Sequence, residues 1–466
     1  MLFSSVPFLY YFLPSVLFLY LLAPKFLKNT VLLLASLVFY AWGEPRYVVI
    51  MLISVALGYL FGLLIERFRE KPVSKLFLTL SVICSLSFLI YFKYADFFIE
   101  NFNAATGLSV PLLKIALPVG ISFYTFQILS YTVDVYRGEV DAQRNPINLA
   151  AYITLFPQLI AGPIVRYSDI ARQLESREHT LEKTAHGIRR FIIGLGKKIL
   201  IADALAGFCA SFTETDEKSV LFFWLYAVAF SLQIYFDFSG YSDMAIGLGK
   251  IFGFEFLENF NYPFISGSIT EFWRRWHISL GTWFRDYVYI PLGGNRVSRW
   301  RGLFNIFVVW MLTGFWHGAA WNFIFWGLFF ALCLLVEKLW LLPYLKKAKV
   351  WNHFYVIALV LLSFALFASE DMGMLAFQLR GMFGLSDAPL ISVQTVYYLR
   401  SYAVVFIVAL IGSTPLIRNV LLSLQKRKNG EKILNLAEPI ALLGLLLVMT
   451  GYLVDGSFSP FLYFRF

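Results

Sequence analysis

The amino-acid sequence predicts an all-α, polytopic integral membrane protein with roughly 11 to 13 spanning or re-entrant helices and short helices at the membrane interface. Two observations lead to this prediction. Hydrophobic residues make up 59% of the 466 residues and charged residues only 15%, whereas a soluble domain contains about 25% charged residues. Long apolar stretches also recur along the whole chain. We therefore expect a multi-pass protein of the cell membrane.

The apolar stretches follow one another along the chain, and each is expected to form a helix. They cover residues 8–23, 31–42, 48–65, 76–92, 115–133, 220–236, 303–315, 322–336, 354–368, 402–411 and 440–454. Several are shorter than the ~20 residues of a simple span, which predicts tilted, broken or re-entrant helices among them. Because no linker or internal repeat divides the sequence, we expect a single membrane domain over residues 1–466.

Basic loops explain the net charge of +10, which does not indicate a nucleic-acid partner. Lys25 and Lys28 follow the first apolar stretch, and a basic cluster at 67–75 follows the third. Cytoplasmic loops of membrane proteins are enriched in lysine and arginine, so we expect both loops on the cytoplasmic face. The three cysteines lie far apart in apolar sequence, and their spacing predicts neither a disulfide framework nor a metal site.

Residues 166–198 interrupt the apolar pattern with an amphipathic one. Apolar Ile170 and Leu174 alternate there with basic Arg172 and Arg177. This pattern predicts helices that lie along the cytoplasmic interface, with basic side chains toward anionic lipid head groups. An ordinary cytoplasmic loop is the alternative interpretation.

Residues 259–301 interleave charges and large aromatic side chains too closely for a plain span or a plain loop. On a continuous helix, Trp273, Trp276 and His277 would share one face. We therefore expect His277 to point inward with the aromatic residues, while Arg285 lies off that face.

Residues 302–336 contain no charged side chain, yet His317 lies near the middle of this run. As one helix the run would extend about 50 Å, well beyond the ~30 Å hydrocarbon core of a bilayer. We therefore expect two tilted or shortened helices that meet near His317 and Gly318. A neutral imidazole at this depth can take a proton from a hydroxyl that attacks an acyl carbonyl, so His317 is a candidate general base. A packing histidine, hydrogen-bonded across the helices, is the alternative.

Other polar groups also lie at apparent membrane depth. Asp237, Tyr241 and Asp243 occur near the end of an apolar stretch, where the carboxylates could bind a cation, orient a histidine or close a helix end. Segment 156–163 contains two prolines and a glycine, and predicts a broken or re-entrant backbone that must be buried or line a cavity. The sequence has no phosphate-binding loop, dinucleotide fingerprint or Gly-x-Ser-x-Gly elbow.

Several of these stretches resemble the membrane-bound O-acyltransferase family, and within it the membrane subunits of bacterial alginate and polysaccharide O-acetylation. They are FPQLIAGPIVR at 156–166, YFDFSGYSDMAIG at 235–247, EFWRRWHISL and WFRDYVYIPLGGNR within 259–296, and GFWHGAAWNFIFWG at 314–327. The resemblance implies helices around a central tunnel, with His317 as the catalytic histidine and His277 as a second characteristic polar position. The further candidates for lining the tunnel or contacting substrate are Trp273, Trp276, Trp316, Asp237, Tyr241, Asp243, Asn322 and Arg285.

The resemblance also implies a reaction. The protein would pass an acyl group, expected to be acetyl, from a cytoplasmic donor toward hydroxyls of an exported or cell-wall polysaccharide. The donor would be acetyl-coenzyme A or an acyl carrier protein, with no tightly bound cofactor. The acceptor would be the sugar itself or a serine on an extracytoplasmic, esterase-like partner. Two alternatives stay open: D-alanyl transfer in teichoic-acid modification, and a non-enzymatic transporter of lipid-linked saccharide.

Overall fold

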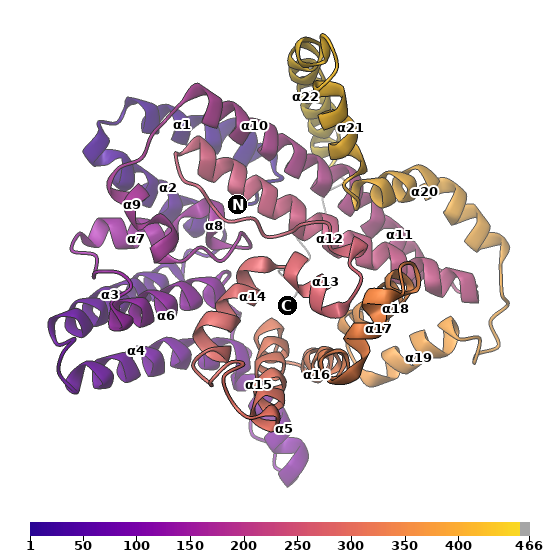
Figure 1. Ribbon diagram of the computed structural model, residues 1–466, viewed down its shortest axis with the longest axis horizontal. Coiled ribbons are helices and arrows are strands. Elements are labelled where there is room, and N and C mark those ends of the chain that lie inside the picture. The colour runs from indigo at the N-terminus through magenta and orange to yellow at the C-terminus, as the bar shows by residue number, and fades with distance from the viewer. Residues whose placement is uncertain (457–466) are drawn as a thin grey trace. The chain divides into compact units, whose positions relative to one another are not determined.

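The computed structural model describes residues 1–456, and all regular secondary structure in that part of the chain is helical (Figure 1). The chain forms two compact units. Unit 1 comprises Met1–Phe191 with Met244–Leu257, and unit 2 comprises residues 192–243 with the chain from Glu258 onward. The all-α prediction is confirmed. A single domain over residues 1–466 stays a prediction.

Unit 1 contains the helices of the first part of the chain. They are η1 (Pro7–Phe12), α1 (Leu13–Leu22), η2 (Lys25–Leu27), α2 (Lys28–Gly43), α3 (Val48–Arg67), α4 (Val73–Leu89), η3 (Ile90–Tyr94), α5 (Ala95–Thr106), α6 (Ile121–Arg137), α7 (Pro146–Thr154), α8 (Phe156–Leu159), α9 (Tyr167–Glu175) and most of α10 (Leu181–Gly196). The predicted break at 156–163 is confirmed, since α8 is only one turn long and is completely buried.

Unit 2 contains the remaining helices. They are η4 (Lys197–Ala202), α11 (Asp203–Glu214), most of α12 (Val220–Ile251), η5 (Pro263–Ile265), α13 (Ile269–Arg275), α14 (Ile278–Phe284), η6 (Arg285–Tyr289), α15 (Arg299–His317), α16 (Trp321–Val336), η7 (Glu337–Leu341), α17 (Leu342–Lys347), α18 (Trp351–Ala368), α19 (Met372–Met382), α20 (Val393–Gly412), α21 (Leu416–Gln425) and α22 (Gly430–Val454).

Eight helices in the described residues are long and apolar enough to cross a membrane. They are Lys25–Gly43, Val48–Arg67, Val73–Thr106, Val220–Ile251, Trp321–Lys347, Trp351–Ala368, Val393–Gly412 and Gly430–Val454, with Pro7–Leu22 as a shorter apolar helix. The other predicted stretches form helices as well, but α6 is shorter and α15 begins in basic sequence. The protein is a multi-pass membrane protein, in which full spans and shorter helices together give the predicted fold.

The uncharged run 302–336 folds as predicted, into two helices that end and begin on either side of Gly318. α15 and α16 cross closely where two glycines face each other. A Cβ added at Gly314 would meet the backbone oxygen of Phe323 at 2.3 Å, and one at Gly327 would meet the backbone oxygen of Trp310 at 2.4 Å. Close backbone approach through small residues is how helices associate in membranes. This crossing fixes the end of α15, where His317 lies.

Gly314→Ala is expected to destabilise the protein by about 1–3 kcal/mol, because the added methyl group overlaps backbone that cannot move aside cheaply. Thermal denaturation of the purified protein in detergent measures the effect. Gly302→Ala is the matched control on the same helix, since its Cβ would meet nothing closer than Lys338 Nζ at 3.9 Å. Equal denaturation midpoints for the two variants would contradict the close crossing.

Candidate active site

His277 is placed by a break between two short helices, and the continuous helix that the sequence predicts here is wrong. α13 ends just before Trp276, α14 begins just after His277, and His277 itself has a left-handed backbone with φ of 46°. This conformation costs a residue with a side chain roughly 1–2 kcal/mol. Asn259 offsets that cost by binding the start of α14. Its backbone oxygen accepts from Ile278 N at 3.0 Å, and its Oδ1 accepts from Ser279 N at 3.2 Å and Oγ at 2.9 Å.

The same contacts define the tautomer of His277. Because Ser279 N donates to Asn259 Oδ1, that oxygen is an acceptor, and His277 Nδ1, at 3.1 Å from it, must carry the hydrogen. The lone pair of the neutral ring is then on Nε2, which is buried and has no hydrogen-bond partner. Burial, with a smaller contribution from the charge of His317, lowers the pKa of His277 well below its usual range. His277 therefore offers a hydrogen-bond acceptor. To polarise a substrate carbonyl, Nε2 of His277 would have to donate a hydrogen bond. That requires the imidazolium form, which the lowered pKa disfavours.

His317 lies at the C-terminal end of α15, and its own helix orients the ring. Its Nδ1 lies 2.7 Å from the carbonyl oxygen of Thr313, one helical turn earlier. A carbonyl oxygen only accepts, so Nδ1 carries the hydrogen and the lone pair of the neutral imidazole is on Nε2. His317 is 8% exposed. This is the tautomer that a general base needs, held in one orientation before any substrate arrives.

Aromatic rings enclose both histidines. The indole of Trp316 contacts both, with ring centroids 5.0 Å from His317 and 6.2 Å from His277. Phe238 packs edge-on against His277 at 4.7 Å, and Trp326 lies 4.8 Å from His317. The two imidazoles thus lie in one apolar cluster, and His277 points toward aromatic residues as the sequence predicts. Electrostatic interactions are stronger in such a low-dielectric environment than in water.

Several buried polar atoms in this cluster have no hydrogen-bond partner within residues 1–456. They include the indole nitrogens of Trp326 and Trp273, whose rings lie 5.6 Å apart. Asn322 donates through Nδ2 to the backbone oxygen of Phe367 at 3.2 Å, but its Oδ1 is also without a partner. Buried polar atoms without partners are rare in folded proteins. These three side chains are therefore candidates for holding a substrate.

Asp237, Tyr241 and Asp243 lie inside α12, so the prediction of a helix end at this point is wrong. Lysines explain why the helix continues through two carboxylates: Lys198 Nζ lies 2.8 Å from Asp237, and Lys197 Nζ lies 2.6 Å from Asp243. Of the three roles that the sequence allows these carboxylates, they bind cations, and the cations are the ammonium groups of the two lysines. Tyr241 is buried on the same helix.

The two remaining candidates have different surroundings. Trp276 is buried in the core of unit 2, stacked on Phe272 with ring centroids 5.6 Å apart and packed on Phe364 at 5.4 Å. Arg285 is largely exposed, and its Nε lies 2.6 Å from the carboxylate of the adjacent Asp286. Trp276 therefore supports the break at His277 by packing, while Arg285 lies outside the buried cluster.

Glu337 holds the start of α13 from a distant part of the chain. Its carboxylate is fully buried and accepts from Ile269 N at 2.6 Å, from Thr270 N at 2.9 Å and from Thr270 Oγ1 at 2.6 Å. Backbone N–H groups at a helix start otherwise lack partners, and a carboxylate there also interacts favourably with the helix dipole. Because α13 leads directly into His277, Glu337 is a positioning residue for the active site.

Glu337→Gln is expected to destabilise the protein by about 1–3 kcal/mol, since an amide NH₂ would face donors that now bind a carboxylate oxygen. We expect the activity of the candidate site to fall with it, mainly through kcat, because α13 and His277 shift together. Thermal denaturation and steady-state kinetics measure the two effects. The exposed Glu370→Gln is the matched control. Unchanged stability and kcat in Glu337→Gln would contradict the positioning role.

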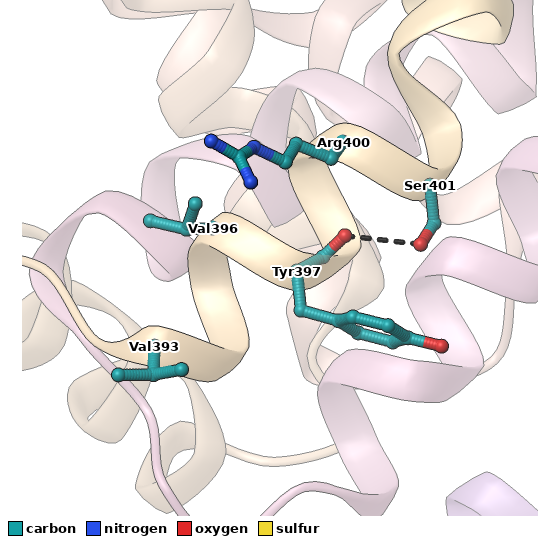
Figure 2. Close-up of a pocket in the computed structure, with 5 residues that line it drawn as sticks. All are labelled: Val393, Val396, Tyr397, Arg400 and Ser401. Carbon is teal, nitrogen blue, oxygen red and sulfur yellow. Dashed lines mark hydrogen bonds between the residues drawn. The ribbon is translucent and has the colours of Figure 1, made fainter.

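A separate groove lies along α20, away from the histidines. It has a volume of about 660 Å³ and is lined by Val393, Val396, Tyr397, Arg400 and Ser401 (Figure 2). Ser401 Oγ donates to the backbone oxygen of Tyr397. None of the predicted site residues lines this groove, and it is not the active-site candidate.

Three groups that shape the site were not identified from the sequence. The carbonyl of Thr313 lies one helical turn before His317, so the predicted helix could have indicated it. Asn259 and Glu337 act on residues 18 to 68 positions away in the chain. No local pattern marks such pairings.

Comparison with known proteins identifies the family of the chain. Residues 139–369 match the membrane-bound O-acyltransferase family, a segment that contains every predicted site residue. A probable alginate O-acetylase of Azotobacter vinelandii is 39% identical over 502 aligned residues, which cover 100% of both chains. A peptidoglycan O-acetyltransferase of Helicobacter pylori is 34% identical over 84% of this chain and 81% of its own. A teichoic acid D-alanyltransferase of Bacillus subtilis is 34% identical over 46% of this chain and 58% of its own.

The two relatives named for O-acetylation thus align with most or all of the chain. The protein belongs to the membrane-bound O-acyltransferase family.

Proposed function

We propose that this protein is a membrane O-acyltransferase that passes an acetyl group from a cytoplasmic donor toward hydroxyls of an exported or cell-wall polysaccharide. The observation that carries the proposal is the geometry of His317. Its Nδ1–H is fixed on the backbone oxygen of Thr313, and the ring lies in an aromatic cluster at the end of a helix that has no charged side chain after Arg301. The relatives that align with most of the chain are named for O-acetylation of alginate and peptidoglycan.

In the proposed reaction, Nε2 of His317 takes the proton from the acceptor hydroxyl as its oxygen attacks the thioester carbonyl of acetyl-coenzyme A. A carbon–oxygen bond forms and the carbon–sulfur bond breaks. The proton on His317 then passes to the departing thiolate, so the imidazole returns to its neutral form. General-base catalysis of this kind contributes roughly 10² to 10⁴ in rate.

Two groups beside His317 fit supporting roles in this reaction. The indole N–H of Trp326 is buried without a partner in ring contact with His317, and it is a donor for the oxygen that becomes negative during attack. Nε2 of His277 is an acceptor, suited to a hydroxyl or amide N–H of a bound substrate. We propose that His277 orients the donor through this acceptor.

The acceptor and the donor are part of the proposal. A sugar hydroxyl, or a serine on an extracytoplasmic esterase-like partner, would receive the acetyl group. An acyl carrier protein in place of acetyl-coenzyme A would change the donor but not the role of His317. D-alanyl transfer is less favoured, because D-alanyltransferase relatives align with only 46% and 54% of the chain, against 84% and 100% for the two relatives named for O-acetylation.

Purified protein in detergent tests the proposal when it is mixed with radiolabelled acetyl-coenzyme A and an oligosaccharide acceptor. We expect labelled acetyl ester on the sugar, or on an added extracytoplasmic partner protein. A parallel reaction contains a D-alanyl-loaded carrier protein as donor. If only D-alanine is transferred, the group that the protein passes on is D-alanyl and not acetyl. No transfer from either donor, by protein that is folded, would contradict it.

A further inference from the structure

We propose that unit 1 contains a binding site for a phosphate group, formed by Lys28, Arg177 and His179 around the ring of Tyr20. This site lies in unit 1, whereas both catalytic histidine candidates lie in unit 2. Phosphate binding itself does not depend on the proposed function, and only the coenzyme A arm of the test rests on it. It lies where α1 ends, α2 begins and the chain leaves α9. The basic loop that contains Lys28 is the one the sequence places on the cytoplasmic face.

A single oxygen brings Arg177 and His179 together. The hydroxyl of Tyr20 donates to the backbone oxygen of Phe252 at 2.9 Å, which uses its one hydrogen. Its oxygen must therefore accept the other two contacts, from Arg177 Nε at 2.9 Å and from His179 Nε2 at 3.2 Å. The hydrogen of a neutral His179 is thus on Nε2, and its Nδ1 is available as an acceptor, or as a second donor once the ring is protonated.

Lys28, the third side chain of the site, lies over the ring of Tyr20. Lys28 Nζ is 4.7 Å from the ring centroid of Tyr20, a cation–π distance. The guanidinium of Arg177 is 5.7 Å from that centroid and 4.4 Å from the centroid of Phe254. Arg177 also donates to Asn29 Oδ1 at 2.7 Å, so its position is fixed on several sides.

No carboxylate balances these charges. Within residues 1–456, no acidic side chain lies within ion-pair distance of Lys28, Arg177 or His179, and the nearby Glu255 pairs with Lys183 at 3.3 Å. Burial, followed by the charges of Lys28, Arg177 and Lys183, lowers the pKa of His179. Lys28 and Arg177 are partly buried cations with no anion of residues 1–456 to offset them, and beside the neutral His179 they form a site that a bound anion stabilises.

The backbone beside the cluster leaves room for the side chains of His179 and Arg177. Gly253 has a φ of 84°, and a Cβ added there would meet the ring of His179 at 2.8 Å and Arg177 Cδ at 3.2 Å. His179 is exposed, and Lys28 and Arg177 are each half-buried, so a ligand can reach the cations from the aqueous side. Arginine with lysine or histidine is the combination that recognises phosphate oxygens.

Two sources supply this phosphate chemistry at a cytoplasmic membrane face: the head group of an anionic phospholipid, and the 3′-phosphate of coenzyme A. The primary experiment measures the affinity for inorganic phosphate itself. Purified protein in a neutral detergent is titrated with phosphate at constant ionic strength, and the thermal denaturation midpoint is followed. Saturable stabilisation is expected for the wild-type protein.

Lys28→Gln is the sharpest variant, because Lys28 makes no hydrogen bond that holds the fold together. We expect it to weaken phosphate binding about tenfold, the usual value of one charged contact. Arg177→Gln is expected to abolish binding and Arg177→Lys to restore it in part. Arg172→Gln, an exposed arginine on α9, is the matched control and should bind like the wild type. A stabilisation that does not saturate, or that is equal in wild type and Lys28→Gln, would overturn the proposal.

Two further arms separate the sources of the phosphate. If the ligand is a lipid, nanodiscs of phosphatidylglycerol, but not of phosphatidylcholine, stabilise the wild-type protein more than Lys28→Gln. If the ligand is coenzyme A, Lys28→Gln raises the KM for acetyl-coenzyme A about tenfold and leaves the KM for its 3′-dephospho form unchanged. Either result supports the phosphate site. Identical behaviour of wild type and Lys28→Gln in both arms contradicts it.

Discussion

His317→Ala is expected to lower the rate of acetyl transfer about a thousandfold, while the protein stays folded and inserted in the membrane. The lost group is the base of the proposed reaction, and a general base contributes roughly 10² to 10⁴ in rate. Folding should survive because the ring hydrogen bond of His317 goes to the backbone of its own helix, which stays helical without it. Single-turnover acetyl transfer, measured beside the thermal denaturation midpoint, separates the two effects.

His186→Ala is the matched control for this prediction. His186 is half-exposed in α10 and faces Glu182 at 3.9 Å, with no contact to the aromatic cluster. The His186→Ala variant should transfer acetyl at the wild-type rate. If His317→Ala retained more than about a tenth of the wild-type rate, the base would have to be another group, since such a loss is smaller than a general base supplies.

Lys198→Met is expected to have the largest effect on stability. The ammonium of Lys198 is 3% exposed and lies 2.7 Å from Asp203 and 2.8 Å from Asp237. Removing the cation would leave two carboxylates together in an apolar interior. Loss of one partner of a buried ion pair costs about 3–5 kcal/mol, because the remaining charge is uncompensated. Thermal or chemical denaturation of the purified protein measures the loss.

The double variant Lys198→Met with Asp237→Asn tests whether the loss comes from the uncompensated charge. It should be more stable than Lys198→Met alone, because one of the two carboxylates is neutralised. Lys197→Met is a graded control, since its pair with Asp243 is partly exposed, at 25% and 15% of the side chains. We expect Lys197→Met to lower the free energy of unfolding by about 1 kcal/mol. A Lys198→Met protein as stable as Lys197→Met would contradict the account of this ion-pair network.

Features with a short-range physical cause could be predicted from the sequence. The uncharged run 302–336 is too long for one span, and the structure divides it at the predicted place, beside His317. The alternation of apolar stretches and basic loops likewise predicts the helical membrane fold, because hydrocarbon solvates apolar helices and excludes charge. Both properties are local and can be read from composition alone.

Features that depend on distant partners could not be predicted. Helical periodicity continues through Trp276 and His277, and only the hydrogen bonds from Asn259 show why the backbone breaks there. In the same way, two carboxylates near the end of an apolar stretch suggest a helix end. The lysines that neutralise them lie about forty residues earlier in the chain. Sequence patterns identify the residues, but tertiary contacts decide their conformation and charge balance.

The phosphate site of unit 1 illustrates the same limit. An amphipathic basic segment at 166–198 predicts contact with anionic head groups, but not which side chains converge. Tyr20 and His179 are separated by 159 positions in the sequence, and their contact becomes visible only in the folded chain.

The central claim is that His317 acts as the base of an acetyl transfer to polysaccharide. Mass analysis of ester-linked acyl groups on the envelope polysaccharide tests it most directly. The cells lack the gene and carry either the wild-type protein or His317→Ala, expressed at equal levels in the membrane. We predict acetyl esters with the wild-type protein and background levels with His317→Ala. Equal acetyl content in the two strains, or acetyl content that does not change when the gene is absent, would contradict the claim.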